Sequence, residues 1–201
     1  MKTIKTMKTM KTMKTIKLLA LLFISTLVFT GCSDDDDHDH DHDHDHEEEI
    51  TQLVYTLTNN NNSNDVVVYT FTDEDGEGGA DGITTVTGSL AANATYTGAL
   101  ELLNLEENEN VGDEIAELDA EEHEIFYITN VASLAIETTD VDGNGNPLGF
   151  DTNVTTGAAG TGVLTISVIH EGKKPNDGTV SDALSNDGTT DIEVTFDVTV
   201  E

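Results

Sequence analysis

The sequence predicts an all-β protein: an antiparallel β-sandwich, immunoglobulin-like or jelly-roll-like, with about eight strands and one short helix, preceded by a disordered tail. From residue 50 onward, apolar and polar residues alternate over short segments, which is the period of a half-buried strand. These segments are rich in Val, Ile, Thr, Tyr and Phe, and the gaps between them hold the turn formers Asn, Asp and Gly. Residues 50–201 are long enough for one core, so they are expected to form a single sandwich domain.

The last segment, 191–201, is the clearest strand. Its apolar residues fall on one face and its acids and threonines fall on the other. The remaining predicted strands are 52–58, 65–72, 83–91, 95–103 and 162–170, together with 124–138, which is long enough for two strands.

Residues 110–126 depart from the period of two. Ile115, Leu118 and then Glu122 follow a spacing of three to four, and Asp113 is placed to cap a helix N-terminus. A short helix is therefore predicted across one end of the sandwich, leading directly into a strand that begins near His123.

Residues 1–31 have the composition of a bacterial secretory signal peptide, whether the chain starts at Met1 or at Met13. Six lysines and no acid precede the apolar run 18–31, which is shorter than the about 20 residues of a transmembrane helix. The only cysteine, Cys32, follows in a context that resembles the lipobox of bacterial lipoproteins, with Phe29 where leucine is usual. The resemblance implies that Cys32 is acylated and anchors the chain to a membrane; a free thiol is the alternative.

Residues 33–49 contain no apolar residue, so nothing in them can offset the entropy of ordering. We therefore expect residues 32–49 to be an acylated cysteine followed by a disordered tether. Imidazoles two residues apart in an extended chain lie about 7 Å apart on one side and suit Zn, Cu or Ni, bound weakly. The predicted ligands are His38, His40, His42, His44 and His46 with Asp39, Asp41, Asp43 and Asp45. A spacer without metal is the alternative.

Two further metal sites are predicted in the folded domain. The segment 140–151 places Asp140, Asp142, Asn144 and Asp151 at the first, third, fifth and twelfth positions of a loop spaced like an EF-hand calcium loop. A hairpin turn explains the same residues without an ion. His123 and His170 each lie beside an acid at a strand end. If the sandwich brings these ends together, they form a metal site with Glu121, Glu122 or Glu171.

Charge and missing motifs restrict the function. The chain has 40 acids against 8 basic residues, a formal net charge of −32, which repels phosphate backbones and argues against a nucleic-acid partner. No H-E-x-x-H, G-x-S-x-G or phosphate-binding glycine loop is present, so we do not expect an enzyme. Apart from the candidate metals, no cofactor is predicted.

Several segments together resemble a group of Bacteroidetes-type surface lipoproteins: GCSDDDDHDHDHDHDHEEE, LAANATYTGALELLN, EEHEIFY and HEGKKPNDGTVSDALSNDGTTDIEVTF. The group is often labelled as a type 1 periplasmic binding fold; that label implies an α/β domain, whereas the periodicity of this chain favours strands. The resemblance implies an outer-membrane lipoprotein facing the cell surface, near a TonB-dependent receptor. The expected function is a binding module that captures a divalent transition metal. The alternative is a structural or adhesive module, stabilised by calcium, with the tail as spacer only.

Overall fold

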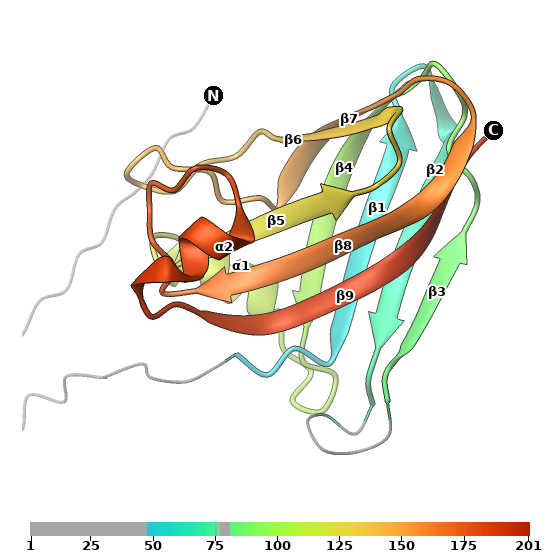
Figure 1. Ribbon diagram of the computed structural model, residues 1–201. Helices are drawn as coiled ribbons and strands as arrows, with labels where there is room; N and C mark the ends of the chain where they lie inside the picture. The colour runs from blue at the N-terminus through green and yellow to red at the C-terminus, as the bar shows by residue number, and fades with distance from the viewer. Residues whose placement is uncertain (1–47, 75, 77–80) are drawn as a thin grey trace, which may run out of the picture. The chain divides into compact units, whose positions relative to one another are not determined.

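The computed structural model describes residues 48–74, 76 and 81–201, and these residues form two antiparallel sheets that face each other (Figure 1). The first sheet has six strands in the order β3-β2-β1-β4-β7-β6, and the second has three in the order β5-β8-β9. The strands are β1 (Gln52–Asn59), β2 (Asn62–Thr72), β3 (Ile83–Thr87), β4 (Thr95–Leu103), β5 (His123–Thr129), β6 (Leu134–Thr138), β7 (Asp151–Thr156), β8 (Gly160–His170) and β9 (Thr189–Val200). The predicted all-β class and antiparallel pairing are confirmed.

A single core lies between the two sheets. Tyr55 of β1 packs against Tyr127 of β5 with ring centroids 5.0 Å apart, and Tyr69 of β2 meets Phe196 of β9 edge-on at 5.6 Å. The alternate residues of β9 beginning at Val194 are all buried, as the alternation in the sequence predicts. Because both sheets contribute large side chains to the same cluster, neither sheet buries its apolar face without the other.

The structure contains one strand that the sequence did not predict, β7. Its sequence, DTNVTT, has one aliphatic residue, and its buried positions are Thr152, Val154 and Thr156. The two threonines are tolerated in the core because each hydroxyl is hydrogen-bonded: Thr152 to the Tyr55 hydroxyl, and Thr156 to the Ala91 carbonyl. Because two of its three buried residues are polar, hydrophobic alternation does not reveal this strand.

The predicted helix is α1 (Val111–Leu118), and it does lead into β5 at His123. The expected N-cap was wrong: Asn110 caps the helix by accepting a hydrogen bond from the Asp113 N–H, and Asp113 lies in the first turn. A second short helix, α2 (Val180–Ala183), continues into a 3₁₀ turn at Leu184–Asn186 and was not predicted.

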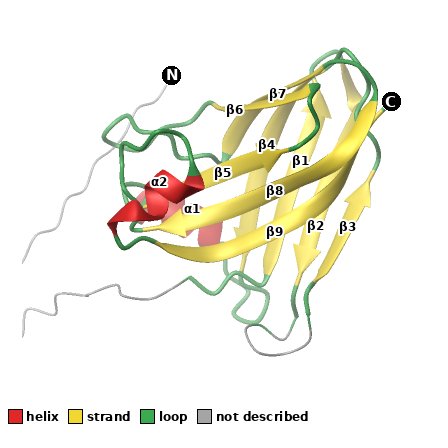
Figure 2. Cartoon of the chain, viewed as in Figure 1, coloured by secondary structure: helices red, strands yellow, loops and turns green. Residues whose placement is uncertain are grey.

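Both helices lie at the same end of the sandwich (Figure 2). Ala183 of α2, with its neighbours Val180 and Leu184, packs on Phe126 of β5 and Ile169 of β8. These two strands are therefore covered on both faces near this end, and every residue of 123–126 and 166–170 is buried.

The stability of the six-stranded sheet is predicted to depend on the absence of a side chain at Gly98 in β4. The Tyr55 and Thr152 hydroxyls form a 2.7 Å hydrogen bond at this point, and a Cβ on Gly98 would lie only 2.2 Å from Thr152 Oγ1. We expect Gly98→Ala to lower the free energy of unfolding by about 1–3 kcal/mol in urea denaturation, because the sheet would be overpacked.

Gly160→Ala in β8 is the matched control, since the nearest atoms to its Cβ would be 4.0 Å away. We expect this control to leave stability unchanged or slightly raised. Equal losses in the two variants would contradict the packing argument.

Candidate metal centre

His123 and His170 meet at the helix-covered end of the three-stranded sheet. His123 is the first residue of β5 and His170 the last of β8, and the antiparallel register places them directly opposite each other. Their rings are stacked, with centroids 4.6 Å apart and planes inclined by 3°. The structure therefore brings together the two histidines that the sequence singled out in the folded domain.

Alternation along the strands places both imidazoles on the core side of the sheet. His123 shares a face of β5 with Ile125, and His170 shares a face of β8 with Val168; both aliphatic residues belong to the main core. The His123 side chain has no exposed surface, and that of His170 is 8 % exposed. The pair thus occupies positions that would otherwise complete the apolar core.

The orientation of the His123 ring is set by the turn that follows α1. Its Nδ1 lies 3.0 Å from the carbonyl oxygen of Asp119. A carbonyl can only accept, so Nδ1 carries a proton, and Nε2 is the nitrogen free to bind a proton or a metal ion. A hydrogen bond from the other ring nitrogen to a backbone carbonyl is the usual arrangement behind a metal-binding histidine.

Glu48 provides a carboxylate at this position. Its Oε2 lies 3.1 Å from His123 Nε2, within ion-pair distance, but without the alignment of a hydrogen bond. The sequence predicts Glu48 as part of the tether, because nothing in a run of acids marks one of them for burial. In the structure, the side chain is only 16 % exposed.

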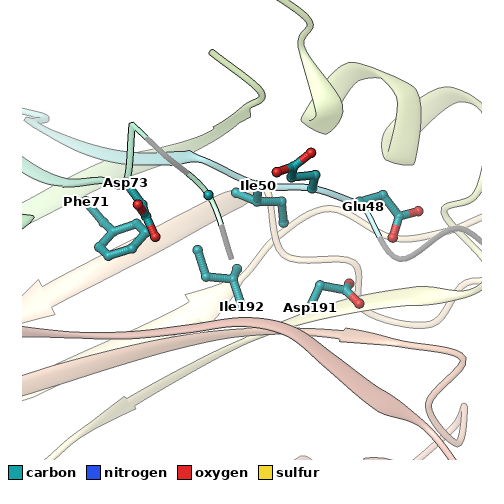
Figure 3. A pocket seen from close by; sticks show the side chains of 8 residues that line it. Glu48, Ile50, Phe71, Asp73, Asp191 and Ile192 are labelled. Carbon is teal, nitrogen blue, oxygen red and sulfur yellow. The ribbon is translucent and has the colours of Figure 1, made fainter. Parts of the chain in front are cut away.

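Asp191 is the second acid that the sequence did not reveal. Strand β9 pairs with β8 through Ile192 opposite Val168 and Thr190 opposite Ile169, so the register shift leaves Asp191 as the extra residue of a β-bulge. The carboxylate that would point to solvent in a regular strand is instead fully buried, with Oδ2 3.6 Å from His123 Nε2. Figure 3 shows Asp191 and Glu48 beside the same pocket.

The surrounding acids determine the charge of the site. Burial favours a neutral imidazole, but the Glu48 carboxylate, the Asp119 carbonyl and the Asp191 carboxylate outweigh burial and raise the pKa of His123. Burial likewise opposes ionisation of Glu48, but the neighbouring His123 and His170 lower its pKa. In the metal-free chain, therefore, His123 and Glu48 each favour the charged form of the other.

Among the described residues, two groups of His, Asp and Glu offer ligand atoms within 4.8 Å of one another. The first consists of Glu48, His123 and His170, which we call the inner cluster. The second consists of Glu122, His170 and Glu171 and is more exposed, with the Glu122 side chain 52 % accessible. Glu122 and Glu171, both considered from the sequence, thus lie beside His170. Glu121 belongs to neither group.

The candidate calcium loop is held by contacts of its own. Asp140 accepts hydrogen bonds from the backbone N–H groups of Gly149 and Phe150. Asp142 accepts from the N–H groups of Asn144 and Asn146, and its Oδ2 lies 3.1 Å from Lys174 Nζ.

Burial opposes ionisation of Asp142, but these hydrogen bonds and Lys174 lower its pKa to about 2. Asn144 and Asp151 are exposed. A lysine ammonium already neutralises the central carboxylate, and calcium binding in this loop stays a prediction.

Other predicted sites lie outside the described residues: the acylation site Cys32, the histidines His38, His40, His42, His44 and His46, and the aspartates Asp39, Asp41, Asp43 and Asp45. Within the described part of the chain, no helix has the length and apolar character needed to cross a membrane. Comparison of the chain with protein-family models, curated proteins and solved structures gave no match.

The raised pKa of His123 predicts a specific pH dependence in the metal-free chain. The pKa of His123 is higher in the folded chain than the ordinary histidine value of about 6.5 that applies to the unfolded chain. Protonated His123 therefore stabilises the fold fully below the unfolded-state pKa, and this contribution is lost as the pH rises through the folded-state pKa. The free energy of unfolding, measured in a chelator from about pH 6 to about pH 9, should therefore fall. His123→Gln should remove this decline.

Glu49→Gln is the matched control, because Glu49 is the exposed neighbour of Glu48 and has the same charge. It should retain the decline. An undiminished decline in His123→Gln would show that another group is responsible.

Proposed function

We propose that this chain is a metal-binding lipoprotein whose folded domain binds one divalent transition metal ion, Zn, Cu or Ni, through His123, His170 and Glu48. The observation that carries the proposal is the position of His123 Nε2: buried, facing a carboxylate oxygen at 3.1 Å, and stacked beside a second imidazole. Two imidazoles and one carboxylate form a common ligand set for zinc.

A cation between Nε2 and Glu48 is required by the chemistry of the two atoms. With Nδ1 donating to Asp119, a neutral His123 would present a lone pair to a carboxylate that also only accepts. Either a proton or a metal ion removes this conflict. Zinc bonds of about 2 Å at a tetrahedral angle separate two ligand atoms by about 3.3 Å, close to the distance between these atoms.

The buried acid next to the ligands favours a divalent ion over a proton alone. Asp191 adds negative charge 3.6 Å from Nε2, and Glu122 lies 3.7 Å from His170 Nε2. A doubly charged ion gains more from these carboxylates than a single proton does, because the attraction scales with charge. The attraction is strongest for Asp191, whose side chain is buried away from solvent.

The proposal assigns different roles to the other parts of the chain. Acylation of Cys32 would hold the protein at the outer membrane, and the His/Asp tail would collect metal ions weakly and reversibly, only two residues before Glu48. Delivery to a TonB-dependent receptor is the step that the sequence resemblance adds. These roles are supported by the sequence patterns, and the inner cluster is supported by its geometry.

Calorimetric titration with zinc of the chain from Ser33 onward tests the proposal. A variant with all five tail histidines changed to asparagine should retain one tight equivalent and lose the weak ones. His123→Gln combined with His170→Gln should weaken the tight equivalent by more than about 100-fold, since loss of second-shell groups alone costs about 10–100-fold.

Glu48→Gln is a milder variant that keeps the core intact and should also weaken binding, whereas Glu49→Gln should not. Circular dichroism checks that each variant is folded. Retention of tight zinc binding by the double histidine variant, together with its loss from the tail variant, would place metal binding in the tail and refute the inner cluster.

A further inference from the structure

A pocket of about 330 Å³ opens beside the inner cluster, and its function is not explained by metal binding (Figure 3). Four acids line it: Glu48 and Glu49 from the segment before β1, Asp73 from the end of β2, and Asp191 from the bulge in β9. The opposing strands thus enclose a small volume of strongly negative potential.

Asp73 gives this pocket an acceptor oxygen without a donor. Its Oδ1 is fully buried and has no hydrogen-bond partner within the described residues. A carboxylate oxygen loses its hydrogen bonds to water on burial, and without a donor in the protein this loss costs free energy. Such oxygens are therefore uncommon in folded proteins unless a ligand or ion binds them.

Among the described residues, both lysines are engaged in contacts outside this pocket. Lys173 and Lys174 are the only basic residues in the described part of the chain. Lys173 binds Asp182 at 2.8 Å, and Lys174 binds Asp142 at 3.1 Å and the Ala120 carbonyl at 2.9 Å. The predicted cleavage after residue 31 removes every other lysine, and the chain contains no arginine. No lysine is among the residues that line the pocket, so its acids would attract a cationic ligand.

The apolar part of the lining indicates an organic cation. Phe71 and Ile192 border the same space as Asp73, and neither metal-ligand cluster among the described residues includes Asp73. An ammonium group offers three N–H donors to carboxylates and is attracted to an aromatic face. An alkyl chain attached to the ammonium group would cover Ile192, whereas a hydrated metal ion would leave this side chain exposed to water. The volume lies near the lower limit for ligand pockets, so the ligand is small.

We propose that this pocket binds a primary ammonium group on a short aliphatic chain, carried either by a free alkylamine or by a lysine side chain of another protein, with Asp73 as its main acceptor. This site is separate from the metal centre and does not require a bound metal ion.

Titration of the chain from Ser33 onward with n-pentylamine, followed by NMR in the presence of a chelator, tests the proposal. The neutral isostere 1-pentanol has the same shape without the charge. We expect saturable binding of the amine that is at least about 10-fold tighter than that of the alcohol. Similar affinities, or no saturation with the amine, would overturn the proposal.

Asp73→Asn keeps the shape of the side chain and should weaken amine binding by about 10-fold. Asp197→Asn, on the exposed face of β9, removes the same charge outside the pocket and should have no effect. Glu49→Gln, at an exposed lining position, should weaken binding even if Asp73→Asn fails to fold. If Glu49→Gln and Asp197→Asn weakened amine binding equally, binding would reflect only the general negative charge of the chain. That result would overturn the proposal.

Capped lysine and capped norleucine distinguish the two sources of the ammonium group. Binding of lysine comparable to that of pentylamine, with norleucine excluded, supports a protein lysine as ligand. Binding of pentylamine alone supports a free amine. Binding of lysine and norleucine with equal affinity would overturn the requirement for charge.

Discussion

Burial of two facing imidazoles at the end of a β-sandwich is the constraint on which the rest of this structure depends. Strands β5 and β8 place His123 and His170 where a core residue would normally lie, and the His123 ring has no exposed surface, so its nitrogens need partners within the protein. The turn after α1 supplies the Asp119 carbonyl, the segment before β1 supplies Glu48, and the bulge in β9 supplies Asp191. Three separate parts of the chain thus converge on one imidazole. Burying the two carboxylates there costs free energy unless a proton or metal ion is bound between them and the imidazole.

The two lysines of the described chain hold this end of the sandwich together. Lys174 joins the loop between β6 and β7 to the turn before β5, through Asp142 and the Ala120 carbonyl. Lys173 fixes α2 through Asp182. Both ammonium groups are used in these contacts, and the partner of Glu48 is His123. The same shortage of basic residues accounts for the negative potential of both the inner cluster and the neighbouring pocket.

Much of the fold could be predicted from hydrophobic alternation, because most strands bury one apolar face. The exceptions have physical reasons: β7 buries threonines whose hydroxyls are hydrogen-bonded, and α2 is too short for a helical period to show. Of the site, His123 and His170 could be found because each lies beside an acid at a strand end. Glu48 and Asp191 could not, since one lies in an acidic run and the other depends on a bulge that only β-sheet register creates.

Anomalous diffraction from crystals of the chain grown with zinc would test the central claim most directly. The account predicts a single strong peak within about 2.3 Å of a nitrogen of His123, a nitrogen of His170 and a carboxylate oxygen of Glu48. Peaks confined to other positions, with His123 Nε2 still directed at Glu48 and no ion between them, would contradict it.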